Sequence, residues 1–319
     1  MKSFYHVDAT SVAEAVSYLD KYGAKAKVMA GGTDLLHQMK GFIRADLPDY
    51  IINIKTIPGL DKITEDSAGL HIGPLVPLSS IAVDPTVVSK YGALAQAARA
   101  VASPQIRNIG TIGGNLCQEV WCWYYRWEHN QFNCIRKGGA TCFASAGDNT
   151  FHSIFGGPKG CYAVVPSDTA MALLALGASV KTSQRTLALD SFFLDTAPGN
   201  VLKANEIITE IVVPPPPSDA KQVFLKYGRR KSFDFAIASV GLLAAPKSGT
   251  VTTASIWLGG VAPMPVRATG AENALKGNTI SETVANNAAA AAVANATPMT
   301  KNSYKTSIVK ALVKRAILA

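Results

Sequence analysis

The sequence predicts an α/β protein with an α+β domain at its C-terminal end, on three observations. Helix-like and strand-like segments alternate over the first half of the chain, and strand-like segments dominate after residue 220 until two closing helices. Between the two regions stand four consecutive prolines at 214–217, which continue neither a helix nor a sheet. A chain of 319 residues is long enough for two or three units. We therefore expect units at 1–57, 58–217 and 218–319.

The first unit is expected to alternate helix and strand around a pair of glycines. Its apolar residues recur first at helical spacing and then as short runs of branched residues. The expected elements are a helix at 11–22, a strand at 26–30, a short helix at 33–40 and a strand at 50–54.

The second unit is expected to continue this alternation, and the third to form an antiparallel sheet. In the second unit we expect strands at 70–72 and 179–182, an edge strand at 206–213, and helices at 78–81, 88–102 and 167–176, with Ser103 and Pro104 ending the helix at 88–102. In the third unit we expect strands at 224–227, 237–244 and 252–259 and helices at 282–296 and 304–318. Residues 117–161 have no helical period and are crowded with aromatic residues and glycines, which is typical of an insertion.

Composition excludes several classes of protein. Hydrophobic residues make up 48% and charged residues 17%, as in a folded globular chain. The N-terminus has no apolar run typical of a secretory signal, so we expect a cytoplasmic protein. No run approaches the ~18 apolar residues of a membrane span. The net charge of +9 comes from scattered Lys and Arg, which disfavours nucleic acid and favours an anionic cofactor or an acidic partner.

Two glycine turns are candidates for binding phosphate. The first covers residues 28–35, where a strand runs into Gly31 and Gly32, and the second covers 105–115 with Gly113 and Gly114. Glycines let the backbone approach a phosphate, and the amides at a helix start favour negative charge. Each turn alone is also compatible with an ordinary capped strand-to-helix connection. Two such turns in one chain favour a diphosphate, and neither is the nicotinamide G-x-G-x-x-G pattern.

All five cysteines fall within 45 residues of the chain, at Cys117, Cys122, Cys134, Cys142 and Cys161. Such clustering without a secretory signal indicates metal or redox chemistry more than disulfides. Structural zinc sites are usually built from close C-x-x-C pairs, and none is present. The dispersed spacing favours a [4Fe-4S] cluster, with zinc and free buried cysteines as alternatives.

The motifs together resemble the FAD-binding medium subunits of the molybdenum hydroxylase family, which includes xanthine dehydrogenase and carbon monoxide dehydrogenase. The resemblance starts from A-G-G-T-D-L at 30–35, I-R-N at 106–108 and T-I-G-G-N at 111–115. It extends over almost the whole chain through P-S-D at 166–168, E-I-I at 206–208, F-L-K-Y-G-R-R at 224–230 and L-G-G-V at 258–261. It implies a two-part FAD-binding domain followed by an α+β domain.

The resemblance also implies which residues hold FAD. Asp168 is expected to accept a hydrogen bond from the ribose or adenine side, and Lys226 to reach the flavin end. Without the resemblance, Asp168 is only a helix-start residue and Lys226 a solvated strand lysine. The implied FAD residues are Val28, Met29, Ala30, Gly31, Gly32, Thr33, Asp34, Leu35, Val101, Ile106, Arg107, Asn108, Thr111, Gly113, Gly114, Asn115, Asp168 and Lys226.

The cysteine insertion resembles that of the cluster-bearing members of the family, such as the 4-hydroxybenzoyl-CoA reductase flavoprotein subunit. In those members the insertion after the G-G-N turn binds a [4Fe-4S] cluster. The implied ligands here are Cys122, Cys134, Cys142 and Cys161. Cys117 would be the spare thiol, although spacing alone leaves it open as a ligand in place of Cys122.

The expected function is therefore that of an electron-transfer subunit carrying FAD and one [4Fe-4S] cluster. The resemblance implies a large partner subunit with a molybdenum-pterin cofactor, a small partner with two [2Fe-2S] clusters, and exchange with an external electron carrier. Two other functions stay open: a self-contained flavin oxidase and a non-catalytic scaffold stabilised by zinc. No His, Tyr or Cys stands in a convincing covalent-flavin motif, which disfavours the oxidase.

Overall fold

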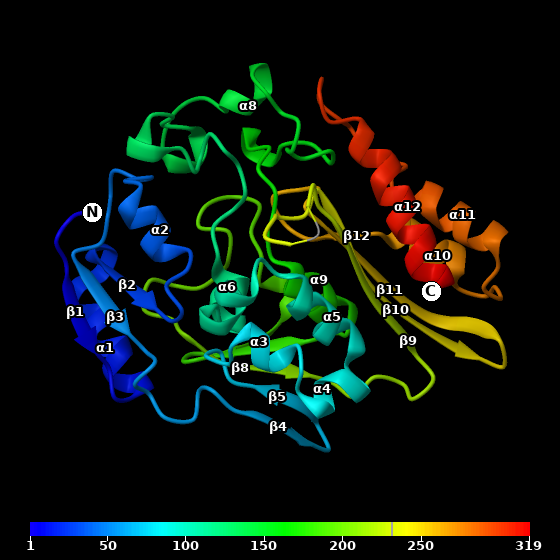
Figure 1. Ribbon diagram of the computed structural model, residues 1–319, viewed down its shortest axis with the longest axis horizontal. Helices are drawn as coiled ribbons and strands as arrows, with labels where there is room; N and C mark the ends of the chain where they lie inside the picture. The colour runs from blue at the N-terminus through cyan, green and yellow to red at the C-terminus, as the bar shows by residue number, and fades with distance from the viewer. Residues whose placement is uncertain (231) are drawn as a thin grey trace.

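The computed structural model describes residues 1–230 and 232–319, which form three sheets in chain order (Figure 1). The first sheet is parallel, in the order β1 (Tyr5–Asp8), β3 (Tyr50–Asn53), β2 (Ala26–Met29). Ser11 caps α1 (Val12–Tyr22), because its Oγ accepts a hydrogen bond from the Glu14 amide at 3.1 Å. The short α2 (Leu35–Lys40) follows the glycine turn. Strand β1 was not expected, since most of its side chains are exposed and show no apolar alternation.

The second sheet is antiparallel throughout rather than parallel. Its order is β4 (Ile63–Asp66), β5 (Gly69–Ile72), β8 (Ile208–Val213), β6 (Ser179–Thr182), β7 (Thr186–Ala188). The expectation that β8 is an edge strand is wrong, because it pairs with β5 on one side and β6 on the other. Polar residues on one face of β8 had suggested an edge strand. Glu210 on that face is instead paired across the strands, with His71 at 3.0 Å and Lys181 at 2.5 Å.

The expected long helix at 88–102 is also wrong, because the structure has two helices there. Asp84 caps α4 (Pro85–Lys90) through the amides of Thr86 and Val87, and the backbone turns at Tyr91 before α5 (Gly92–Ala100). Tyr91 is fully buried, so the apolar pattern continues across the break. Ser103 and Pro104 begin a helix instead of only ending one: Ser103 caps α6 (Pro104–Ile109).

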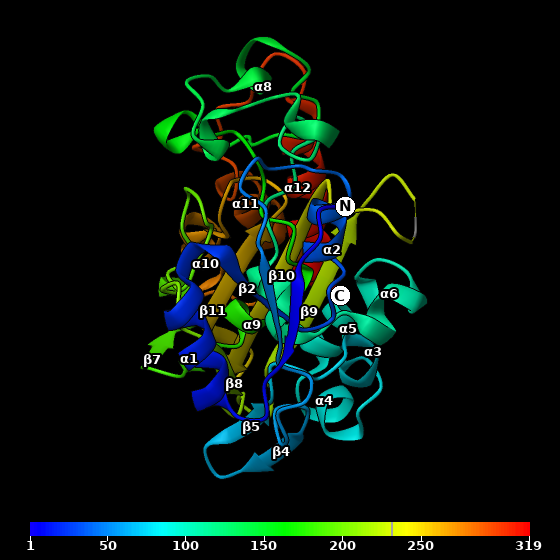
Figure 2. The same ribbon diagram turned by 90° about the vertical axis from the view of Figure 1, so that its left-hand side faces the viewer.

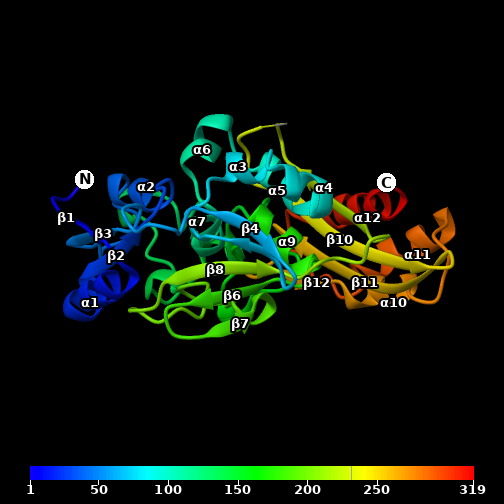
Figure 3. The same cartoon turned by 90° about the horizontal axis from the view of Figure 1, so that it is seen from below.

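Helices join the second and third sheets. The short α3 (Leu78–Ile81) packs on α5 and α6, while α5 and α9 (Asp168–Ala175) pack against the third sheet and share a core with the second (Figure 1). The contact is close, since a side chain at Gly241 would lie 2.2 Å from the Met171 carbonyl oxygen. Figure 3 shows the three sheets in a row along the molecule.

The third sheet has the order β12 (Val266–Arg267), β11 (Thr250–Gly259), β10 (Ala238–Lys247), β9 (Lys221–Tyr227), all antiparallel. Helices α10 (Thr269–Leu275) and α12 (Tyr304–Leu318) pack on it, and α11 (Glu282–Ala291) packs against both of these helices. The apolar spacing did not predict α10, and it placed the end of α11 at residue 296, whereas this helix ends at Ala291. In the described part of the chain, no helix is both long and apolar enough to cross a membrane.

Residues 117–161 contain only short helical segments, of which α8 (Phe143–Ala146) is one, and lie at one end of the molecule (Figures 1 and 2). On one side the His129 amide donates to the Gly41 carbonyl oxygen at 2.7 Å. On the other side Asn149 exchanges hydrogen bonds with Thr300 and Lys301, at 3.1 and 2.9 Å. The segment therefore bridges the N-terminal and C-terminal parts of the chain.

Candidate functional site

The two glycine turns lie directly against each other. A Cβ atom at Gly31 would lie only 2.1 Å from the carbonyl oxygen of Ile109, which belongs to the second turn. Gly32 has a φ of +72°, which side chains other than glycine rarely adopt. Glycine is therefore required at both positions, at 31 by the contact between the turns and at 32 by the backbone conformation.

The second turn begins α7 (Ile112–Cys117), which the sequence did not show as a helix. Thr111 caps it, because its buried Oγ1 accepts a hydrogen bond from the Gly114 amide at 3.2 Å. Asn115 is buried and accepts hydrogen bonds from the Ser167 and Thr169 hydroxyls at 2.7 and 2.6 Å. The Asn115 side chain therefore ties the turn to α9, while Gly114 is exposed beside it.

A cleft of about 1580 Å³ runs along both turns and reaches the insertion and the β9–β10 connection. That exceeds the 300–1,000 Å³ or so of a typical small-molecule pocket, and it matches an extended ligand such as a dinucleotide. Sixteen of the implied FAD residues line it: Val28, Met29, Ala30, Gly31, Gly32, Thr33, Asp34, Leu35, Val101, Ile106, Thr111, Gly113, Gly114, Asn115, Asp168 and Lys226.

Arg107 and Asn108 are not among the residues that line the cleft. Arg107 instead supports the cleft wall from behind. Its Nη1 donates to the carbonyl oxygens of Val101 and Ala102 at 2.7 and 3.2 Å. Ala102 has a φ of +41°, so these hydrogen bonds help hold a strained backbone next to Val101.

Asp168 and Lys226 form a buried ion pair, with Oδ2 and Nζ 2.6 Å apart. Lys226 also donates to the Ala100 carbonyl oxygen at 3.0 Å. Burial raises the pKa of Asp168, and the attraction of Lys226 acts in the opposite direction. Lys226 is thus not a solvated lysine. The two side chains therefore lie at the same part of the cleft, and the separate roles expected for them toward FAD stay predictions.

Asp34 is bound by the insertion as well as by Gln38 of α2, whose Nε2 donates to its Oδ2 at 2.9 Å. Its Oδ1 lies 2.6 Å from Nη1 of Arg126, and its Oδ2 accepts from the Glu119 amide at 2.9 Å. Asp34 makes no side-chain cap on α2. Arg126 also donates to the carbonyl oxygens of Val120 and Glu119, at 2.9 and 2.5 Å. The sequence carries no local signal for this role of Arg126, which lies among aromatic residues.

Replacing Arg126 with methionine is expected to destabilise the protein, because it leaves the Asp34 carboxylate without its cation. The Arg126 side chain is 7% exposed, and removing one partner of a buried pair costs about 3 kcal/mol or more. Denaturant unfolding measures the loss. In the Arg126→Met background, Asp34→Asn should cost much less than it does alone. Equal costs of Asp34→Asn in both backgrounds would show that the pair contributes nothing.

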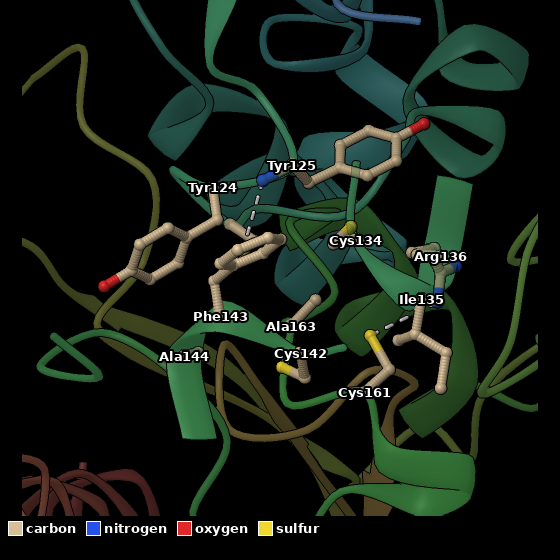
Figure 4. A pocket seen from close by; sticks show the side chains of 11 residues that line it. Tyr124, Tyr125, Cys134, Ile135, Arg136, Cys142, Phe143, Ala144, Cys161 and Ala163 are labelled. Atoms are coloured by element: carbon tan, nitrogen blue, oxygen red, sulfur yellow. Dashed lines mark hydrogen bonds between the residues drawn. The ribbon is translucent and has the colours of Figure 1, made fainter. Parts of the chain in front are cut away.

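Four cysteines line one small pocket within the insertion: Cys122, Cys134, Cys142 and Cys161. Figure 4 shows Cys134, Cys142 and Cys161 around it, with Tyr124 and Phe143 alongside. All but Cys142 are buried. Cys117 lines the large cleft instead and is absent from the lining of this pocket.

Burial favours the neutral thiol at three of the five cysteines. Burial raises the pKa of the Cys122 and Cys117 thiols to about 12 and also raises that of Cys161. Across the described residues, no three His, Cys, Asp or Glu side chains come together as a site for a single metal ion. Four of the thiols line one shared small pocket.

Two further residues contact the cysteines and were not predicted from the sequence. His152 places its Nε2 3.1 Å from the Cys122 sulfur, and Arg136 points Nη1 at the Cys161 sulfur from 4.0 Å. Burial, and to a smaller extent Lys305, lower the pKa of His152 to about 4, so the imidazole is neutral at pH 7. Neither residue belongs to a recognisable motif.

Family models match both parts of the chain. Residues 2–216 match the FAD binding domain in molybdopterin dehydrogenase, and residues 223–319 match the CO dehydrogenase flavoprotein C-terminal domain. The chain is 35% identical over 282 residues to the FAD-binding subunit of an aldehyde oxidoreductase from Escherichia coli, with 84% of each chain covered. It is 30% identical to the carbon monoxide dehydrogenase medium chain of Hydrogenophaga pseudoflava, covering 99% of this chain and 96% of that one.

Solved structures agree with this relationship. The structure of carbon monoxide dehydrogenase from Hydrogenophaga pseudoflava, which lacks the Mo-pyranopterin moiety of its cofactor, matches with a TM-score of 0.79 and 29% identity. The match covers 100% of this chain and 97% of that one. The expected fold, a mixed helix-and-sheet FAD-binding part followed by a C-terminal domain, is confirmed.

The fold and the paired glycine turns along one long cleft define a flavoprotein of the two-domain type. The chain belongs to the family of FAD-binding medium subunits of molybdenum-dependent dehydrogenases. Its relatives are flavoprotein subunits of oxidoreductases.

Proposed function

We propose that this chain is an electron-transfer subunit that carries both FAD and one [4Fe-4S] cluster within a multi-subunit molybdenum hydroxylase. The observation that carries the cluster is the meeting of Cys122, Cys134, Cys142 and Cys161 in one pocket. These residues are spread over 40 positions of an irregular segment, yet they line a common space beside the cleft. The fifth cysteine faces elsewhere.

FAD fits the large cleft. The two glycine turns expose backbone along its floor, and a side chain at Gly114 would extend into space where only the Thr111 hydroxyl lies within 4 Å, at 3.1 Å. We assign the FAD diphosphate to residues 28–35 and to Thr111, Gly113 and Gly114, with Asn115 supporting them through α9. When bound, FAD exchanges electrons singly or in pairs, which links two-electron chemistry to iron-sulfur centres.

The side chains of the cysteine pocket suit the ligation of a [4Fe-4S] cluster. Soft thiolates are the ligands iron-sulfur clusters require, and apart from Arg136 the rest of the pocket is lined by apolar and aromatic side chains. Arg136, a buried cation, points at Cys161. In a cluster-bound protein the four sulfurs would be thiolates, which would give that cation a negative counterpart.

The partners follow from the family. Relatives are described as medium chains or medium subunits, including the medium subunit of a nicotine 6-hydroxylase from Paenarthrobacter nicotinovorans. We propose that this chain likewise assembles with a large subunit holding a molybdenum-pterin cofactor and a small subunit with two [2Fe-2S] clusters, and exchanges electrons with an external carrier. We also propose that units 1–57, 58–217 and 218–319 are its domains, in line with the three sheets.

Metal analysis tests the cluster directly. Anaerobically purified protein is expected to hold about four irons and four acid-labile sulfides per chain. Its visible spectrum should combine flavin bands with a broad iron-sulfur shoulder. Flavin bands alone would favour a self-contained flavin oxidase, and one zinc without sulfide or flavin would favour a scaffold. Either result would refute the proposed pair of cofactors.

A further inference from the structure

Arg136 is a buried arginine in the wall of the cysteine pocket (Figure 4). It is 5% exposed and donates to the carbonyl oxygens of Asp195 and Thr196 at 3.2 and 3.1 Å. Its third contact is the Cys161 sulfur, 4.0 Å from Nη1. The remaining donor, Nε, is buried and has no hydrogen-bond partner among the described residues. The guanidinium is therefore only partly satisfied by the chain itself.

Arg136 forms no direct ion pair, although its charge acts on the buried Glu119 carboxyl and opposes the rise in pKa that burial causes there. Over residues 1–230 and 232–319, its hydrogen bonds go only to two carbonyl oxygens and one thiol, and no ion pair within 4.0 Å includes it. An isolated buried charge is costly, so buried cations are normally paired with an anion. Elsewhere among the described residues, buried Arg126 pairs with Asp34 and Lys226 pairs with Asp168. Buried Lys305 is the exception, since it donates only to carbonyl oxygens, and burial lowers its pKa to about 7. An arginine, unlike that lysine, keeps its charge when buried.

The next residue in the chain, Lys137, is likewise a cation held by carbonyl oxygens. Lys137 donates to the carbonyl oxygens of Ile43 and Tyr125 at 3.0 and 3.2 Å and lies 5.6 Å from the Tyr125 ring centre. Two cations thus follow Cys134 closely, and both are held by neutral groups. A cluster held by four thiolates carries net negative charge and would give these cations an anionic counterpart in the pocket. Of the two cations, only Arg136 lines the pocket.

We propose that Arg136 is a positioning residue that supplies the compensating positive charge to the cluster and raises its reduction potential. This inference depends on the proposed [4Fe-4S] site. Reduction adds negative charge to the cluster, so a fixed cation beside a ligand sulfur stabilises the reduced form more than the oxidised form. Net charge and hydrogen bonds to the sulfurs are the main protein contributions to such potentials.

The position of Arg136 also links the two cofactor sites. Its partners Asp195 and Thr196 precede Ala197 and Pro198, which line the FAD cleft. The guanidinium is therefore held between the cysteine pocket and the wall of the cleft. Its two carbonyl hydrogen bonds fix that orientation, since a planar guanidinium can donate to both carbonyls while still pointing toward Cys161.

The test compares Arg136→Met, which removes the charge, with Arg136→Lys, which keeps it. Each variant is purified anaerobically, its iron and sulfide are counted, and its cluster is titrated by low-temperature paramagnetic resonance at controlled potentials. Arg136→Met is expected to shift the midpoint potential to more negative values, and Arg136→Lys to restore most of the shift. Arg315→Met is the control, because it removes an exposed charge on α12 and should leave the potential unchanged.

A cluster-loaded Arg136→Met protein with the wild-type potential would overturn the inference. If Arg136→Met does not retain its cluster, the comparison is made between Arg136→Gln and Arg136→Lys. A more negative potential in the glutamine variant than in the lysine variant supports the role of charge, and equal potentials reject it. Absence of iron and sulfide from the wild-type protein would instead refute the proposed cluster, so the two failures are distinguishable.

Discussion

Replacing Gly114 with valine is expected to give a folded protein that no longer retains FAD. Gly114 is exposed in the cleft, at the start of α7 and beside Thr111. Among the described residues beyond its own helix backbone, a Cβ atom placed there would contact only the Thr111 hydroxyl oxygen, at 3.1 Å, which has to shift by a few tenths of an ångström, so the fold itself should accept a side chain. A branched side chain would occupy the space that the diphosphate must enter, and FAD content should fall at least tenfold.

The other cleft glycines do not allow such a clean test. A side chain at Gly31 would collide with the Ile109 carbonyl oxygen, and Gly32 has a left-handed backbone, so both substitutions would also disturb the fold. Gly92→Val is the matched control, because Gly92 begins α5 outside the cleft and has no atom within 4 Å of an added Cβ.

FAD stoichiometry after gel filtration and the far-ultraviolet circular dichroism spectrum are measured for both variants. The Gly92→Val protein should keep its FAD, and both proteins should keep the wild-type spectrum. Full FAD retention in Gly114→Val would contradict the assignment of the second glycine turn to the FAD site.

Local patterns in the sequence were sufficient to predict most of the elements around the cleft. Helix α12 begins and ends where the apolar spacing places it, and Ser11 and Ser167 cap helices as their positions indicate. The glycine pairs were also visible, because glycine marks backbone that must lie close to another group. What local patterns lack is information on which side chains meet across the fold.

The partners of Asp34 and Lys226 show this limit. Asp34 meets Arg126, 92 residues later, and Lys226 meets Asp168, 58 residues earlier. The sequence indicated a contact with the cofactor for Asp34 and for Lys226. It did not indicate their protein partners, because these partners stand at no fixed spacing from them. The same holds for Arg136, whose place in the wall of the cysteine pocket is a property of the folded chain. The break at Tyr91 was hidden for a different reason: a buried tyrosine continues the apolar pattern that predicts one helix.

Changing any one of Cys122, Cys134, Cys142 and Cys161 to serine is expected to remove or degrade the cluster, whereas Cys117→Ser should keep it. Serine oxygen is a poor substitute for a soft thiolate ligand to iron. The four line one pocket, and Cys117 lines the FAD cleft instead, which favours Cys122 over Cys117 as the ligand. Iron content of the four variants should fall by more than half.

The same set of variants tests whether the two cofactor sites are separable. FAD should remain bound in the Cys134, Cys142 and Cys161 variants, because these residues do not line the cleft. Some FAD loss is expected for Cys122→Ser, since the neighbouring Trp121 and Trp123 do line it. Each protein is measured for iron, sulfide, FAD and the low-temperature paramagnetic signal of the reduced cluster. If the signal is lost in Cys117→Ser and kept in Cys122→Ser, then Cys117 is the cluster ligand in place of Cys122. The cluster would in that case lie against the FAD cleft.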